Sequence, residues 1–425
     1  MLILTGDGSQ SIYGFRGACP EVFCGADKRL RDVHTLHLPS NYRSLSGIVA
    51  VGNAVAADIG AEWTAGLVAQ HVRAGEATIK PLVGRDPLFA AYVAADTIAA
   101  EVAAGRRKAS DFAILIRTNN AAALYEGALM ARGIPCVRWG GTPFWERKDV
   151  LGFVGYGLLS AGGERGLVDD VTLVQDRGAF RAVINRPLRY LPRAWADAVV
   201  QRVHRGEPLI GAIRSETAGI RSKQRGAAMD LASFIERSQR HTWPHVVSLV
   251  RAKLLEDTPK ANDEQPDEER RAVPATCAGI ALREMYDGRP LENGLEFAMY
   301  ADASARNSER TKGDLPAGKV IISTIHKYKG LQQRCVILPM DHGLFPHKRS
   351  LGSAEREAEE LRLLYVAVTR AQDALYIVLS TQSLDGDNIP ESPFLRYFSE
   401  DVQHAARERM RAVGEFEADA EWVAK

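Results

Sequence analysis

The feature that most constrains this chain is an alternation of short apolar runs with helix-like periodicities, which one long polar stretch interrupts. Apolar runs bounded by glycine or polar residues predict buried strands, and six occur, at residues 2–5, 35–38, 112–116, 320–324, 336–338 and 375–379. Between them, apolar residues recur at helical spacing after Ser44, from Pro87 to Gly105, and over residues 355–372. Strands that alternate with helices in this way predict an α/β protein with a parallel sheet.

The interruption spans residues 146–315. Strand-like runs become rare there, while arginine, glutamate, glutamine and alanine become frequent. We interpret this stretch as a mainly helical domain inserted into the α/β domain, with a polar loop at residues 257–271. The α/β domain then consists of two separate pieces, residues 38–145 and 316–398, and residues 399–425 form a charged C-terminal tail with a peripheral helix.

Composition limits the class of protein more than its function. With 425 residues, 46% hydrophobic content and a formal charge of +1, the chain is expected to form two or three packed domains, and its net charge neither supports nor excludes nucleic-acid binding. Its five cysteines show neither a disulfide framework nor zinc spacing. The first ten residues lack the basic start and long apolar run of a signal peptide. We therefore expect a cytoplasmic protein and predict no metal site.

Four short stretches contain residues suited to binding phosphates or nucleic acid. They are GDGSQSIYGFRGA at 6–18, NYRS at 41–44, TIHKYKGL at 324–331 and LYVAVTRA at 364–371. Each lies where a strand gives way to a loop or helix, or on a helix face that packing does not use, which is where α/β proteins bind ligands. We therefore expect the four stretches to form one site.

In the first stretch, the amide of Gln10 precedes two aromatic rings and a guanidinium, those of Tyr13, Phe15 and Arg16. Interleaved rings and arginine can stack on the bases and bind the phosphates of single-stranded nucleic acid. Taken alone, however, this short spacing fits a core aromatic pair beside a surface arginine better.

The second and fourth stretches each supply an arginine. Tyr42 and Arg43 precede a helix, so the ring could lie on a base while the guanidinium binds a phosphate; alone, the stretch fits a solvated loop better. Arg370 is a candidate for stabilising negative charge in phosphoryl transfer. The alternative is a surface arginine that pairs with Glu359 or Asp373.

Taken together, in this order and with the large insertion between the second and third, the stretches closely resemble motifs III, IV, V and VI of the UvrD/Rep-type superfamily 1 DNA helicases. Four further segments also resemble the family: DFAILIRTN at 111–119, GTPFWERK at 141–148, VINRP at 183–187 and SPFL at 392–395. The resemblance covers residues 1 to about 398. It implies that residues 38–145 and 316–398 form a RecA-like domain, preceded at 1–37 by the C-terminal remnant of a first RecA-like domain.

In this family, two RecA-like domains clamp ATP and Mg²⁺ between them. The resemblance implies that Arg43 and Arg370 bind the γ-phosphate and that Gln10 senses it. Tyr42 would stack on the adenine. The family usually has a glutamate for the ribose where this chain has Gln332, so that contact would become one with an amide.

The resemblance also implies that single-stranded DNA crosses the upper surface of the two domains and that the protein moves 3′ to 5′. Tyr13, Phe15 and Arg16 would contact this DNA, and His326 would lie near its backbone. Another departure is Leu361, which stands where the family usually has the first arginine of a pair.

The half of the ATP site that binds the inner phosphates is expected on a separate N-terminal helicase half. Upstream of the run at 2–5 there is no room for a Walker A lysine, an Mg²⁺-binding Ser/Thr or an acidic motif, so the protein ligands of Mg²⁺ are expected on that half as well. The stretch GDLPAGK at 313–319 matches a phosphate-binding loop in spelling only, because Val320 replaces the Ser/Thr and a strand follows. We expect no DNA-stimulated ATP hydrolysis from the chain by itself.

Two functions remain open. The chain is either the C-terminal part of an ATP-dependent 3′–5′ DNA helicase or translocase, acting on single-stranded or duplex DNA in unwinding, repair or recombination, or a non-catalytic module derived from a helicase. The second would bind DNA or a protein partner without turnover.

Overall fold

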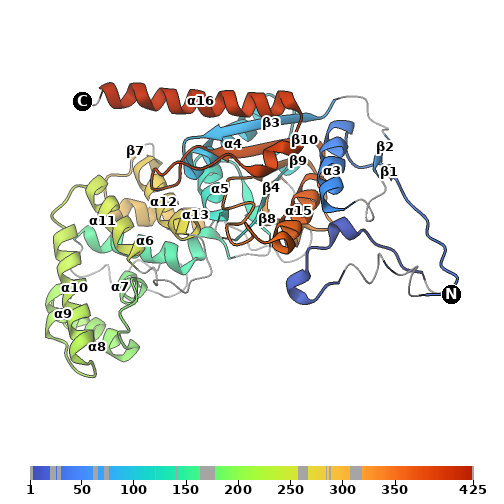
Figure 1. Ribbon diagram of the computed structural model, residues 1–425. Helices are drawn as coiled ribbons and strands as arrows, with labels where there is room; N and C mark the ends of the chain where they lie inside the picture. The colour runs from blue at the N-terminus through green and yellow to red at the C-terminus, as the bar shows by residue number, and fades with distance from the viewer. Residues whose placement is uncertain are drawn as a thin grey trace. The chain divides into compact units, whose positions relative to one another are not determined.

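A computed structural model describes residues 3–19, 25, 30–60, 66–70, 76–119, 121–139, 142–162, 178–256, 267–283, 285–286, 289–306 and 318–423. The chain divides into two compact units, one formed by Met1–Gly140 with Gly313–Lys425 and the other by Gly141–Lys312. The first unit is α/β and the second is mainly helical (Figure 1). The predicted α/β class with a parallel sheet is confirmed.

The α/β unit is built on a six-stranded sheet in the order β3-β10-β9-β4-β8-β5, in which every neighbouring pair is parallel. Its strands are β3 (Thr78–Gly84), β4 (Phe112–Ile116), β5 (Cys136–Arg138), β8 (Val320–Thr324), β9 (Gln333–Pro339) and β10 (Ala371–Ser380). β4 and β8 are buried along their whole length, because both faces of such a sheet are covered. The last four of the six predicted runs are therefore strands.

The described part of this unit contains six helices: α3 (Ser46–Ile59), α4 (Pro87–Ala103), α5 (Ala122–Met130), α14 (Ile325–Tyr328), α15 (Ala354–Val368) and α16 (Glu400–Val423). α4 confirms its predicted limits, since Asp86 accepts a hydrogen bond from the Phe89 amide at 2.9 Å and Gly105 follows with φ of +67°. α16 packs against the edge strand β3.

The predicted helix at 355–372 ends early, at Val368. The hydroxyl of Thr369 donates to the carbonyl of Tyr365 at 2.8 Å, and Nε of Arg370 donates to that of Val366 at 3.0 Å. These side chains satisfy carbonyls of the last turn, which otherwise lack partners. β10 can therefore start at Ala371.

Two predicted strands are wrong. Residues 3–5 and 35–38 form no strand, and Ile3, Leu4, Leu36 and Leu38 are 51–87% exposed. A strand needs a neighbour that accepts its main-chain hydrogen bonds, and no described strand lies beside either run. The only nearby pairing is the two-residue ladder of β1 (Ser40–Asn41) with β2 (Val68–Ala69), among the described residues.

The helical unit contains eight described helices: α6 (Lys148–Ser160), α7 (Ala179–Val183), α8 (Arg193–His204), α9 (Leu209–Ser215), α10 (Ser222–Ser238), α11 (Trp243–Leu255), α12 (Asp267–Arg283) and α13 (Gly294–Arg306). Trp145 packs edge-on against Phe144 and Phe297, and the indole of Trp243 donates to the carbonyl of Ala281 at 2.9 Å. The polar loop expected at 257–271 lies outside the described residues up to 266, and its last five residues belong to α12.

The described cysteines, Cys19, Cys136, Cys277 and Cys335, are free thiols. Within the described ranges, no three His, Cys, Asp or Glu side chains gather in a way that could hold a metal ion. None of the helices in that part of the chain is long and apolar enough to cross a bilayer.

A close approach of two helices in the helical unit provides a test of its packing. A Cβ on Gly294 of α13 would lie 1.7 Å from the carbonyl oxygen of Gly157 in α6. We expect Gly294→Ala to lower the free energy of unfolding by roughly 1–3 kcal/mol or more, because the backbones must separate. Gly226→Ala on α10 is the matched control, since nothing lies within 4 Å of its added Cβ. Urea unfolding should show it stabilised by about 0.5–1 kcal/mol, and equal effects of the two substitutions would contradict the close approach.

Candidate functional site

Three predicted site residues lie together at the end of the sheet where the strands begin. Gln332 directly precedes β9 and Arg370 directly precedes β10, and these two strands are parallel neighbours. Arg43 lies just ahead of α3, and the next residue, Ser44, donates a side-chain hydrogen bond to the carbonyl of Ala371. Residues far apart in the sequence are thereby brought side by side.

The guanidinium groups of Arg43 and Arg370 bind to the same residue. Nη1 of Arg43 donates to the carbonyl of Thr369 at 3.0 Å, and Nη2 of Arg370 donates to its hydroxyl at 3.1 Å. Nε of Arg43 also donates to Oε1 of Gln332 at 2.9 Å, and Nη1 of Arg370 to the carbonyl of Leu331 at 3.2 Å. Within the described residues, every acceptor bonded to these two groups is a neutral oxygen.

The alternative reading of Arg370 as a surface arginine is wrong. Arg370 is 2% exposed. The carboxylate of Asp373 instead accepts from Arg107 at 2.7 Å and from Arg334 at 2.9 Å.

Electrostatics makes this pair of cations suited to an anion. Burial and the nearby charge of Arg43 lower the pKa of Arg370 to about 10, and burial also lowers the pKa of Arg43. Asp7 offsets part of the repulsion from a distance without bonding to either arginine. Because like charges held together raise the energy of the protein, a bound anion would relieve it. The arginine pair therefore supplies positive charge that an anion would neutralise.

Gln10 connects the pair of Arg43 and Arg370 to the first stretch. Its Nε2 donates to Oδ2 of Asp7 at 2.7 Å, and its Oε1 accepts from Nη2 of Arg370 at 3.4 Å. Asp7 also accepts from the Ser9 amide at 3.0 Å, which fixes the short 3-10 helix Gly8–Gln10. Asp7 thus orients the Gln10 amide, a role that the sequence analysis missed although Asp7 lies in the first stretch.

Tyr13 lies against the third stretch. Its hydroxyl donates to the carbonyl of His326 at 3.0 Å, and the two rings lie 6.1 Å apart. The guanidinium of Arg16 lies 5.7 Å and Nζ of Lys329 5.4 Å from the centre of the Tyr13 ring. Lys329 also donates to the carbonyl of Gln10 at 2.8 Å. Lys329 belongs to the third stretch, but its role was not predicted.

Phe15 and Tyr42 are the two remaining predicted site residues. Phe15 belongs to the 3-10 helix Gly14–Arg16, and its side chain lies outside what the structure describes. Tyr42 is 75% exposed. It lies in a turn where Oδ1 of Asn41 accepts from the amides of Arg43 and Ser44, both at 2.9 Å.

A buried ion pair lies at the opposite end of the sheet, where the strands end. Arg117 follows β4 and His326 follows β8, at the ends of those strands. Nε and Nη2 of Arg117 donate to Glu360 at 3.0 and 2.8 Å, and Glu360 on α15 is 1% exposed. Glu360 was not predicted as a site residue, because its only signal in the sequence is its place in the acidic part of that helix.

The arrangement differs from the one site expected where strands run into loops. The arginine pair lies at the beginning of its strands, whereas His326 follows the end of β8. The two places are joined by the segment that holds Gln10 and Tyr13.

Comparison with known proteins places these features in one family. The family model for the UvrD-like helicase C-terminal domain matches residues 36–158 and 225–382. The chain is 28% identical over 432 residues to the ATP-dependent DNA helicase UvrD1 of Mycobacterium tuberculosis (strain ATCC 25618 / H37Rv), covering 94% of this chain and 53% of that protein. It is 27% identical over 428 residues to the ATP-dependent DNA helicase PcrA of Staphylococcus epidermidis (strain ATCC 12228 / FDA PCI 1200), covering 96% and 56%. The chain thus spans about half the length of these relatives.

The environment of His326 predicts a specific pH dependence. Burial and the charge of Arg117 lower its pKa from 6.5 to about 4. The unfolded chain therefore takes up this proton first, so stability from neutral His326 is complete above pH 6.5 and is lost as the pH falls toward 4. His326→Gln should weaken the pH dependence of the urea midpoint in this window. The exposed His241→Gln should not, and identical pH profiles for all three proteins would contradict the low pKa.

Proposed function

Because the chain belongs to the family of UvrD-like helicase C-terminal domains, we propose that it is the C-terminal part of an ATP-dependent DNA helicase or translocase that moves 3′ to 5′. The observation that carries this proposal is the link between two unlike sites. Gln10 reaches the arginine pair, and Tyr13, three residues later, reaches His326. A change at the first site is thereby passed to the second through one short segment.

In this proposal, the arginine pocket receives the γ-phosphate of ATP. ATP with Mg²⁺ supplies the phosphoryl group whose hydrolysis drives movement. Arg43 and Arg370 neutralise the negative charge of this phosphoryl group. In the structure, the oxygens that accept hydrogen bonds from the two arginines are neutral, so the positive charge of the arginines is still available. Gln10 exchanges its bond to Arg370 when a phosphate takes its place, Tyr42 offers its exposed ring to adenine, and Gln332 faces the ribose.

Single-stranded DNA is the proposed ligand of the second site. The cations of Arg16 and Lys329 both lie close to the ring of Tyr13, at 5.7 and 5.4 Å from its centre, which suits a base stacked beside its phosphates. Phe15 and His326 belong to the same surface in this proposal. His326 would act as a neutral group at physiological pH, because its pKa is about 4.

The domain limits, the Mg²⁺ ligands and the location are also proposed from the chain's membership of this family. We propose that residues 1–37 belong with a first RecA-like domain and that residues 146–315 are an insertion in the second, which consists of 38–145 and 316–398. The protein ligands of Mg²⁺ are proposed to lie on a separate N-terminal half. The protein is proposed to act in the cytoplasm, in DNA unwinding, repair or recombination.

The pocket is tested by binding of a fluorescent ATP analogue to the 425-residue chain. Arg370→Ala and Arg43→Ala should each weaken binding at least about tenfold, because each removes charge-assisted hydrogen bonds that contribute about 1.5–3 kcal/mol. Arg396→Ala is the control, since this arginine is 62% exposed and pairs with Asp58. Binding that is equally sensitive to all three substitutions, or to none, would overturn the assignment.

Substituted chains also distinguish the helicase from the alternative function, a non-catalytic module. A non-catalytic DNA-binding module would bind single-stranded DNA with an affinity that Tyr13→Ala lowers, while its nucleotide binding would not depend on Arg370. The helicase proposal requires both dependences.

A further inference from the structure

A short loop that leads from α14 into β9, residues 328–333, holds both arginines of the candidate site. The carbonyl of Leu331 accepts a hydrogen bond from Nη1 of Arg370 at 3.2 Å. Oε1 of Gln332 accepts one from Nε of Arg43 at 2.9 Å. Each arginine therefore has an acceptor on this loop, and the separation of the two guanidinium groups depends on how firmly the loop is fixed.

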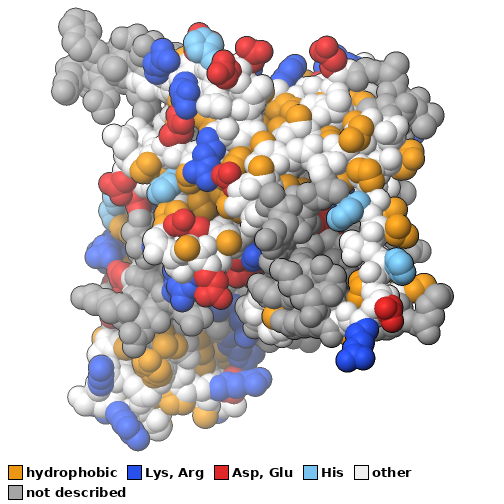
Figure 2. Space-filling model, turned by 45° about the vertical axis from the view of Figure 1, so that its right-hand side comes forward, with side chains coloured by type: hydrophobic (Ala, Val, Ile, Leu, Met, Phe, Trp, Pro, Cys, Tyr) orange, Lys and Arg blue, Asp and Glu red, His pale blue; other side chains and the backbone are white. Residues whose placement is uncertain are grey.

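The charge of the molecular surface does not hold the two arginines together. On the upper part of the face shown in Figure 2, cationic and anionic side chains are interspersed, in line with the formal charge of +1. The two guanidinium groups also repel each other, because they carry like charges. Their positions therefore depend on short-range hydrogen bonds, and those that fix the loop at 328–333 are among them.

Tyr328 closes this loop through two hydrogen bonds. Its main-chain carbonyl accepts from the Leu331 amide at 3.1 Å, and its hydroxyl donates to Oε1 of Gln333 at 2.8 Å. The hydroxyl oxygen also lies 3.5 Å from the carbonyl oxygen of Gln332. Tyr328 is 0% exposed, so its hydroxyl has to find its partner inside the protein. The first residue of the loop thereby fixes the last one.

Gln333 connects the loop to the two strands beside β9, which are β4 and β10. Its Nε2 donates to the carbonyl of Ser110, which lies just ahead of β4. Its main-chain amide donates to the carbonyl of Arg370, just ahead of β10, at 2.9 Å. The Tyr328 hydroxyl therefore orients a side chain that reaches one neighbouring strand, while the backbone of the same residue reaches the other.

We propose that Tyr328 is a positioning residue of the arginine pair, because its hydroxyl orients Gln333 and so fixes the loop that sets the separation of Arg43 and Arg370. This inference rests on the proposed function, in which the pair binds the γ-phosphate of ATP. Two guanidinium groups can both donate to one phosphate only at a suitable separation. The contribution of Tyr328 is this geometry and not a contact with the phosphate.

The Tyr328 hydroxyl is suited to this role because it stays protonated. Burial raises the pKa of Tyr328, although the nearby charge of Arg370 lowers it. A neutral hydroxyl donates its hydrogen bond to Gln333 without adding a negative charge beside the arginines. The loop is therefore fixed and the positive charge of the pair remains available to an anion.

The test measures binding of the fluorescent ATP analogue to the 425-residue chain. Tyr328→Phe should weaken binding roughly fivefold, because one buried hydrogen bond is lost and Oε1 of Gln333 is left without its donor. In the Arg43→Ala background the loss should be clearly smaller, since one of the two arginines that the loop positions is gone. A purely structural role would not produce this non-additivity.

A second variant separates positioning from stability. Tyr328→Phe combined with Gln333→Leu removes the donor and the acceptor together, so the free energy of unfolding in urea should recover in part. Binding of the analogue should stay weak, because the loop still lacks its connection to Ser110. Recovery of binding together with stability would overturn the positioning role. This variant also decides the question if Tyr328→Phe alone does not fold.

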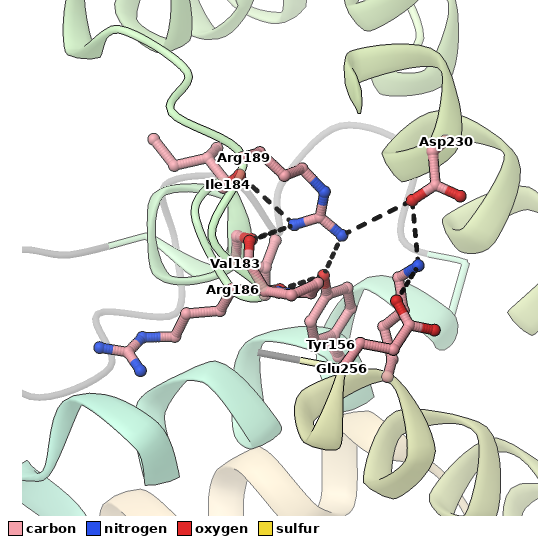
Figure 3. Close-up of polar contacts among 9 residues, drawn as sticks. Tyr156, Val183, Ile184, Arg186, Arg189, Asp230 and Glu256 are labelled. Carbon is pink, nitrogen blue, oxygen red and sulfur yellow. Dashed lines mark hydrogen bonds and ion pairs between the residues drawn. The ribbon is translucent and has the colours of Figure 1, made fainter. Parts of the chain in front are cut away.

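Tyr156 of the helical unit provides the matched control (Figure 3). It is 1% exposed, and its hydroxyl donates to the carbonyl of Arg186 and accepts from Nη2 of Arg189 at 2.9 Å. Tyr156→Phe therefore removes the same kind of buried hydroxyl outside the α/β unit. It should lower the free energy of unfolding and leave the affinity for the analogue unchanged, with or without Arg43→Ala.

The outcomes separate this inference from the proposed function. If Arg43→Ala and Arg370→Ala weaken binding but Tyr328→Phe does not, the positioning role is overturned and the proposed function stands. If neither arginine substitution weakens binding, the proposed phosphate site fails and the positioning role fails with it. If Tyr156→Phe weakens binding as much as Tyr328→Phe, or if Tyr328→Phe and Arg43→Ala are fully additive, the loss reflects stability and the positioning role is again overturned.

Discussion

Electrostatic repulsion between two arginines is the constraint on which the site of the α/β unit depends. Arg43 and Arg370 bond to the same residue, Thr369, and the charge of each opposes that of the other. The fold holds them in place with carbonyl, hydroxyl and amide oxygens, which give geometry but do not neutralise charge. Two like charges held in this way raise the electrostatic energy of the protein, and in the proposed function the phosphate of ATP relieves it. The neighbouring elements can all be understood as the supports that keep these two side chains together.

The helix α15 is the main support, because it connects the arginine pair at one end of the sheet with Arg117 at the other. Glu360 near its middle holds Arg117 at the end of β4, while Thr369 and Arg370 follow its last residue. A helix has a fixed rise per residue, so the separation of these groups is set by their positions in the sequence. The segment Gly8–Gln10 packs on the same helix. A movement of α15 would therefore displace Glu360, Thr369 and Arg370 together, and with them the partners of Arg117 and Arg43.

Sequence patterns gave the centre of this fold and not its borders. β4 and β8 were predictable because a fully buried strand is a continuous apolar run. Residues 35–38, Thr-Leu-His-Leu, are only half apolar, and no described strand lies beside them. The site residues in the four stretches were identifiable by type. The roles of Lys329 and Glu360 were not, because they arise from contacts between distant residues, such as that of Lys329 with Gln10, 319 positions apart. The role of Asp7 is local, through Ser9 and Gln10, but an acidic residue beside a glycine has many other uses.

The departure at Gln332 gains a physical meaning from the arginine pair. Its Oε1 accepts a hydrogen bond from Nε of Arg43 at 2.9 Å. A glutamate in this position would form an ion pair and neutralise one of the two cations, and a bound phosphate would then compete with a carboxylate of the protein. The amide orients Arg43 equally well but leaves its charge available. Under the proposed function, this chain exchanges a charged contact to the ribose for a more positive arginine pair at the phosphate.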